Sequence, residues 1–210
     1  MKKFFSILFV LFFSLAGFSK DKPFKLQLKI DGMQDSTCYL LNYYGSKMYY
    51  NDTAQFNSQG VVVFNQETQP KGGLYIVYTG GKRLFELIIN NENNIELATD
   101  TSDYVGKMNV KKSKENTVFF DYLKFLSKKQ KDALPLQNQL KNKEISEKEK
   151  KKINTQLAAT GEAIKEYRAD AIAKNNDLFV SVFFKAMNET VIPPFESVKN
   201  DSLKKLLNYR

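Results

Sequence analysis

The sequence predicts an α+β fold in which an N-terminal antiparallel β-sandwich is followed by an α-helical hairpin or small helical domain. Apolar and polar residues alternate in short segments between residues 24 and 99, which is the period of half-buried strands. Beyond residue 116 the apolar residues recur every three or four positions, as in amphipathic helices. The charge changes with the period. Residues 21–110 hold 8 basic and 10 acidic side chains, a net of −2, whereas residues 111–210 hold 21 and 13, a net of +8.

Residues 1–19 have the pattern of a secretory signal peptide. Lys2 and Lys3 precede an apolar run from Phe4 to Leu15, and small residues follow at positions 16, 17 and 19. This run is shorter than the roughly 20 apolar residues that span a bilayer. We therefore expect export to the periplasm or cell envelope, with no transmembrane segment after signal removal. No nucleic-acid partner is expected, because an exported protein seldom meets nucleic acid.

Seven short strands are predicted for the sandwich, which we assign to residues 20–110. In the segment "FKLQLKI", Phe24, Leu26, Leu28 and Ile30 share one face, and the intervening polar residues share the other. The later strands are expected at residues 37–43, 49–56, 61–64, 74–78, 84–89 and 95–99. Turn-forming segments such as "NSQG", "KGG" and "NNENN" separate them, and short strands separated in this way are typical of a β-sandwich.

The helical domain is assigned to residues 111–210. One apolar stripe runs from Phe119 to Leu126, and a second runs from Ile153 to Ala171. The segment "SEKE" at 146–149 predicts a capping box, in which Ser146 and Glu149 satisfy each other's free backbone donors at the start of the second helix.

Other features of this domain concern where helices break and end. Pro135 is expected to kink or divide the first helix. Shorter helices are expected at residues 178–187 and 202–208. The chain ends directly after apolar helical turns, so we expect the helical domain to be truncated at its C-terminal end.

The composition excludes several classes of active site. The sequence has no histidine, which removes imidazole-dependent triads and dyads and histidine metal ligands. A single cysteine excludes a CxxC redox pair and a cysteine zinc site within this chain. No GxGxxG or P-loop pattern occurs. We therefore predict no catalytic residue, no metal ligand and no cofactor for these residues.

Two further segments have both a functional and a structural interpretation. The loop "NNENNIE" holds Asn90, Asn91, Glu92 and Glu96, whose oxygens are of the type that binds calcium, but the spacing is not that of a calcium loop and a polar turn explains it. The basic runs "KKSK" and "KEKKKIN" would suit an acidic lipid or polymer, whereas solvated helix faces are usually charged as well. The structural interpretation is preferred for both.

Five tyrosines form the candidate interaction surface: Tyr39, Tyr43, Tyr44, Tyr49 and Tyr50. Aromatic rings stack on the apolar faces of sugars, so these strands would suit a glycan or a peptide. Tyrosine is also an ordinary residue of half-buried strands, and this alternative stays open.

The lone cysteine, Cys38, lies within "DSTCYLLNYYG", in a predicted strand. No cation adjoins it in the sequence to favour the thiolate. Free cysteine packs as a small apolar residue more often than it reacts, so a structural role is predicted. An intermolecular disulfide is the alternative.

Nearly the whole mature sequence resembles the N-terminal region of exported, Bacteroidetes-type thioredoxin-like thiol-disulfide oxidoreductases of the alkyl hydroperoxide reductase and TlpA type. The matching features are G-x-x-x-x-x-x-Y-L-x-x-Y-Y-G from Gly32, the run "DTAQFNSQGVVVF" from Asp52, and the strand "LFELII" followed by a polar turn. In that family a thioredoxin domain with a CxxC pair follows. The sequence departs from the family pattern by ending first, so no catalytic residue can be carried over.

The resemblance implies a non-catalytic accessory module that binds or positions within a periplasmic thiol-disulfide oxidoreductase. Its partner would be a C-terminal thioredoxin-like domain in a longer parent chain, or envelope proteins, and a homo-oligomer is possible. The alternative is a stand-alone envelope binding protein that recognises a glycan or peptide through the tyrosine-rich strands.

Overall fold

The structure is a computed structural model that describes residues 23–45, 47–142 and 144–188 of the 210-residue chain. The predicted signal peptide and the predicted helix at 202–208 lie outside the described residues. Within them the elements are β1 (Phe24–Asp31), β2 (Thr37–Tyr44), β3 (Lys47–Gln55), β4 (Val61–Gln66), β5 (Gly73–Thr79), β6 (Lys82–Ile89), β7 (Asn94–Asp100), β8 (Asn109–Lys112), α1 (Lys114–Leu140), α2 (Glu147–Lys174) and α3 (Phe179–Ala186).

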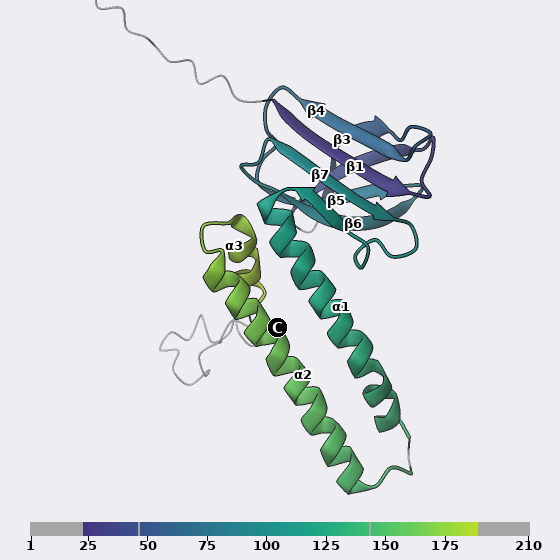
Figure 1. Cartoon of the computed structure of the whole chain (residues 1–210), viewed down its shortest axis with the longest axis vertical. Coiled ribbons are helices and arrows are strands. Elements are labelled where there is room, and N and C mark those ends of the chain that lie inside the picture. Colours follow the sequence, from purple (N-terminus) through teal and green to yellow (C-terminus); the bar gives the residue numbers. More distant parts are fainter. Residues whose placement is uncertain (1–22, 46, 143, 189–210) are drawn as a thin grey trace, which may run out of the picture.

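The strands form two layered four-stranded sheets, ordered β4-β1-β7-β8 and β3-β2-β5-β6 (Figure 1). The predicted α+β class with an N-terminal sheet region is confirmed. The first seven strands lie within two residues of their predicted ends, whereas β8 was not predicted because "NVKK" is short and polar. Among the described strand pairs, β1 and β7 alone run parallel, since β7 returns to the first sheet by a crossover from the second and not by a hairpin.

The core lies between the two sheets. The predicted inward face of β1 is confirmed, because Phe24, Leu26, Leu28 and Ile30 are each at most 1% exposed. Burying a side chain of this size stabilises the fold by about 1.5–3 kcal/mol. Gly60, in the predicted "NSQG" turn, has a φ of 72°, and a Cβ there would lie 2.4 Å from the Ile30 carbonyl oxygen. The turn therefore requires glycine.

The start of α2 agrees with the sequence prediction, whereas α1 differs from it at Pro135. The predicted capping box is present: the Ser146 hydroxyl accepts from the Glu149 N–H at 3.3 Å, and the Glu149 carboxylate accepts from the Ser146 N–H at 3.2 Å. Pro135 does not divide α1, which continues through it to Leu140. Proline removes only the hydrogen bond to the carbonyl of residue 131, and the flanking turns keep theirs.

We call the antiparallel pair α1 and α2 the helical arm, and it projects from one end of the sandwich (Figure 1). Aromatic rings fill the base of the arm, where α3 packs against it. Phe125 stacks on Tyr167 with ring centroids 4.1 Å apart, and Tyr122 lies 4.6 Å from Phe184. These contacts join all three helices into one body at the end nearest the sandwich.

Candidate functional site

The five candidate tyrosines lie on β2 and β3, but on two faces of the sheet. Tyr39, Tyr43 and Tyr50 share the outer face, away from the core, and the rings of Tyr39 and Tyr50 meet edge to face at 5.2 Å. Tyr44 and Tyr49 lie on the opposite face near the β2–β3 turn, with ring centroids 6.3 Å apart. The structure therefore brings three of the predicted residues together and separates two from them.

A polar group accompanies the tyrosines of the outer face. The Tyr43 hydroxyl donates to Glu86 Oε1 at 3.0 Å, and Arg83 Nη1 donates to the same oxygen at 3.1 Å. The Arg83 guanidinium also lies 5.8 Å from the centroid of the Tyr43 ring. Partial burial raises the pKa of Tyr43, and its bond to Glu86 raises it further. These groups satisfy one another, so the outer face holds an internally bonded aromatic and charged cluster.

Exposed large hydrophobic side chains gather on the β2–β3 hairpin. Four of the seven among the described residues lie there, with exposed fractions of 78% for Tyr44, 48% for Met48, 47% for Tyr49 and 68% for Tyr50. Single exposed apolar residues are ordinary, whereas a cluster of them marks an interaction site. Met48 was not among the predicted residues, because a lone methionine in a sequence carries no surface signal.

Cys38 lies on the core face of β2 and is fully buried. It belongs to the same apolar cluster as Leu40 and Val77. Burial raises the pKa of its thiol to about 12. The sulfur is thus protonated at neutral pH, and it lacks the exposure that an intermolecular disulfide requires.

A buried polar junction connects the sandwich to the helical arm. Asn116, in the first turn of α1, is fully buried, and its Nδ2 donates to the Ile88 carbonyl at 2.7 Å while its Oδ1 accepts from the Ile88 N–H at 2.8 Å. Because β6 is an edge strand, no strand pairs with the outward backbone groups of Ile88, and the Asn116 amide makes the two hydrogen bonds that a neighbouring strand would make.

Two carboxylates complete this junction by capping helices. Glu92, from the β6–β7 loop, accepts from the Ser113 hydroxyl and from the first backbone N–H of α1. Glu115, which is 2% exposed, accepts from the first two backbone N–H groups of α3 at 2.8 Å each. A carboxylate at a helix N-terminus satisfies free donors and is favoured by the helix dipole. The junction therefore ties together β6, α1 and α3.

The junction also explains the loop "NNENNIE". Asn90 Nδ2 donates to Glu115 at 3.2 Å, whereas Glu96 pairs with Lys111 at 3.3 Å and Lys112 at 3.7 Å. The oxygens of the loop thus bond to different elements and do not gather around one point. Sequence analysis missed the capping role, for which the available signal was an Asn- and Glu-rich strand end followed by "SKEN" at a helix start.

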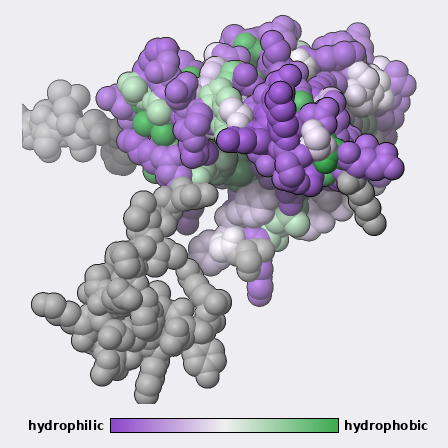
Figure 2. Space-filling view, turned by 90° about the horizontal axis from the view of Figure 1, so that it is seen from below, coloured by the Kyte–Doolittle hydropathy of each residue, from purple (hydrophilic) through white to green (hydrophobic). Residues whose placement is uncertain are grey.

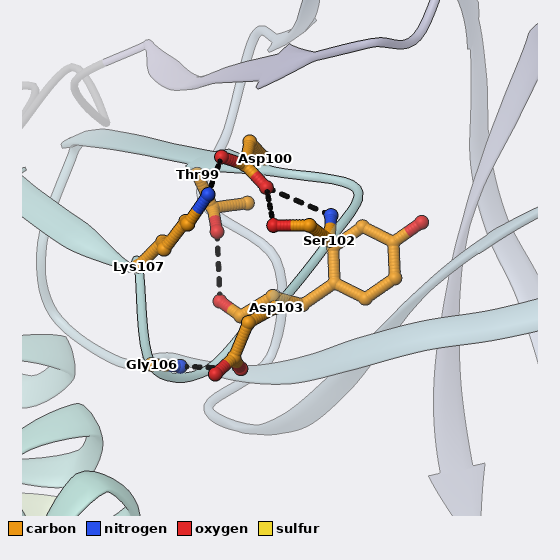
Figure 3. A network of polar contacts seen from close by, with 7 residues as sticks. Thr99, Asp100, Ser102, Asp103, Gly106 and Lys107 are labelled. Carbon is orange, nitrogen blue, oxygen red and sulfur yellow. Dashed lines mark hydrogen bonds and ion pairs between the residues drawn. The ribbon is translucent and has the colours of Figure 1, made fainter.

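The loop between β7 and β8 holds a second polar network (Figure 3). The Asp100 carboxylate accepts from the Ser102 N–H at 2.7 Å and from Lys107 Nζ at 2.5 Å, and Asp103 accepts from the Gly106 N–H at 2.8 Å. The hydrogen bond from Lys107, followed by those from Ser102, holds the pKa of Asp100 well below its ordinary value. The hydrogen bonds of both carboxylates stay within the loop, and Asp103 also pairs with Lys131 of α1 at 4.0 Å, so the network stabilises a turn that lies beside the arm.

The helical arm is charged and solvated. The surface seen from below the arm is mainly hydrophilic, with only small hydrophobic areas (Figure 2). Lys150, in the second basic run, pairs with Glu147 at 2.6 Å. A groove between α1 and α2 is lined by a mixed set that includes Leu134, Leu157, Ile164 and several polar residues. Among the described residues of the arm, Leu134 is the one exposed large hydrophobic side chain, whereas four gather on the β2–β3 hairpin.

The described residues contain no group of three or more His, Cys, Asp or Glu side chains placed to hold a metal ion. In the same part of the chain, no helix has both the length and the apolar character needed to span a bilayer. No protein-family model, no curated protein and no solved structure matches this chain.

Proposed function

We propose that this chain is a non-catalytic binding and positioning module of an exported thiol-disulfide oxidoreductase. The buried junction is the observation that carries the positioning role. Asn116 bonds to Ile88 of β6, and Glu92 of the β6–β7 loop accepts from the first backbone N–H of α1, so these two bonds fix the helical arm relative to the sandwich, whereas Glu115 ties α3 to α1. Moving the arm away from the sandwich would break these buried hydrogen bonds and lower the stability of the protein, which favours one fixed orientation of the arm.

The redox chemistry is assigned to a thioredoxin-like domain that follows in a longer parent chain, as the sequence resemblance implies. A disulfide cycle within one chain requires two thiols that exchange. This sequence has one cysteine, and Cys38 is buried. In the proposed arrangement the sandwich supplies the binding surface and the helical arm sets the spacing to the redox domain.

The positioning role is tested by measuring distances between spin labels. Labels at Lys82→Cys on the sandwich and Gln130→Cys on α1, in a Cys38→Ala background, are expected to give one narrow distance distribution by pulsed electron resonance. Asn116→Ala is expected to broaden it, whereas Asn138→Ala, an exposed change in the same helix, leaves it unchanged. A broad distribution in the unmodified junction would contradict the positioning role.

The accessory role is tested by activity and by the reading frame. The mature chain is expected to show no turnover in insulin disulfide reduction, and the reading frame beyond Arg210 is expected to encode a thioredoxin-like domain with a CxxC pair. Turnover at the rate of a thioredoxin would overturn the proposal.

A second candidate is a stand-alone envelope protein that binds a glycan or peptide through the tyrosines. The exposure of Tyr44, Tyr49 and Tyr50 favours it, because clustered exposed aromatic side chains are typical of an interaction surface. A stop codon directly after Arg210 in the natural gene would favour this candidate over the first.

A further inference from the structure

The two edge strands of the β3-β2-β5-β6 sheet differ in the partners of their outward backbone groups. At the β6 edge, Asn116 satisfies both backbone groups of Ile88. At the β3 edge, no strand of the described residues pairs with β3 on its outer side. Every second residue of an edge strand directs its N–H and C=O away from the sheet, so the β3 edge presents unpaired backbone groups.

Only the second half of β3, from Asn51 onward, has features that prevent pairing with another strand. A bulge leaves Asn51 without a partner on β2, and Gln66 of β4 donates to Asn51 Oδ1 at 3.2 Å and Asp52 Oδ2 at 2.9 Å. Bulges, charges and covering side chains are devices that prevent edge pairing. The first half, Lys47–Tyr50, carries only the charge of Lys47, and all four of its residues are exposed. This half is the open edge.

Apolar side chains flank the open edge on both faces of the sheet. Met48 and Tyr50 lie on the outer face, and Tyr49 lies with Tyr44 on the other. A sugar ring or the surface of a folded protein would engage one face only. An extended polypeptide added as a strand projects alternate side chains to both faces, and so it contacts both sets.

The charge of Lys47 indicates which kind of polypeptide the open edge binds. Lys47 makes no ion pair within the described part of the chain. The carboxylate of Glu86, on the outer face of the sheet, is bonded to Tyr43 and Arg83. An acidic residue in the occupant would complement Lys47, whereas a second copy of the chain would bring another Lys47 to the same short edge.

We propose that the open edge, Lys47–Tyr50, binds an extended apolar polypeptide segment with an acidic flank, as an added strand of the β3-β2-β5-β6 sheet. Main-chain hydrogen bonds supply affinity, and the rings of Tyr49 and Tyr50 hold alternate side chains of the segment. The inference rests on the proposed binding function and names its partner as an unfolded or extended polypeptide.

The test uses the mature chain and a fluorescein-labelled peptide of alternating valine and tyrosine with glutamate at both ends. Fluorescence anisotropy is expected to show binding, and Tyr49→Ser and Tyr50→Ser are each expected to weaken it by about tenfold. Leu134→Ser, which removes from α1 an apolar side chain whose exposed fraction of 55% lies between those of Tyr49 and Tyr50, is the matched control and leaves binding unchanged. Circular dichroism shows whether each variant keeps its fold.

Two changes test the contributions of main-chain hydrogen bonds and of the Lys47 charge to peptide binding. Methylating successive peptide nitrogens, so that neither edge of the peptide keeps its donors, is expected to abolish binding, because it removes the donors that pair with β3. Lys47→Glu is expected to reverse the preference between peptides with glutamate ends and peptides with lysine ends.

Several outcomes would overturn the inference. They are no peptide binding, loss of binding in only one tyrosine variant, or indifference to N-methylation. A concentration-dependent dimer in analytical ultracentrifugation that Tyr49→Ser abolishes would assign the edge to a second copy and would also overturn it. The spin-label distances and the insulin assay remain independent of these results, so failure here is distinguishable from failure of the proposed function.

Discussion

Asn116→Ala is expected to be among the most damaging single substitutions in this chain, although it replaces a polar residue on a helix. The Asn116 amide is fully buried and bonds both backbone groups of Ile88 on the β6 edge. Alanine leaves that N–H and C=O without partners in an environment that water does not reach. The damage therefore falls on the sheet as well as on the helix.

The magnitude follows from the number of orphaned groups. Each buried backbone group without a partner costs about 1–3 kcal/mol, so two cost about 2–6 kcal/mol. Alanine recovers about 0.6 kcal/mol because its helix propensity exceeds that of asparagine. The free energy of unfolding is thus expected to fall by about 1.4–5.4 kcal/mol. At about 3 °C per kcal/mol for a chain of this size, Tm falls by roughly 4–16 °C.

Urea unfolding followed by circular dichroism measures the effect. Asn138→Ala is the matched control, because Asn138 lies exposed near the end of the same helix, and a surface change of this kind is expected to alter stability by less than about 0.5 kcal/mol. If both variants unfold at the same urea concentration, the β6 edge does not depend on Asn116, and the argument for a fixed arm fails.

Four further predictions concern other parts of the chain. Cys38 is expected to react slowly with iodoacetamide up to about pH 10 and quickly once unfolded, because burial raises the pKa of its thiol to about 12; fast native labelling would contradict its burial. Lys107→Met is expected to raise the pKa of Asp100 toward its ordinary value of 3.8 in an NMR titration. Since that folded pKa is depressed, the stabilisation is present at neutral pH and is lost as the pH falls below this value. Ser146→Ala is expected to lower the free energy of unfolding by about 1 kcal/mol in urea, and no change would show that the capping box does not stabilise α2. Limited trypsin digestion, followed by mass spectrometry, is expected to cut first after Lys141, between α1 and α2; a first cut at the junction would show that it opens easily.

The candidate site was predictable only in part. The tyrosines of the β2–β3 hairpin were identifiable because five of them fall within twelve residues. Their division between two faces follows from strand alternation, but the bulge at Asn51 and the open edge of β3 depend on which strand lies beside β3. Strand order is a long-range property, so no local pattern reports it.

The sequence by itself determined the first seven strands, the start of α2 and the inward face of β1, but not β8. The alternation in β1, the turn that ends in Gly60, and the capping box at Ser146 are each set by interactions over a few residues, and all appear where the local pattern places them. Only the tertiary structure decided that β1 and β7 run parallel and that Asn116 and Glu115 serve as structural joints. These features join residues that lie 28 to 69 positions apart, where the partner is selected by packing of the whole chain and no local sequence pattern reports it.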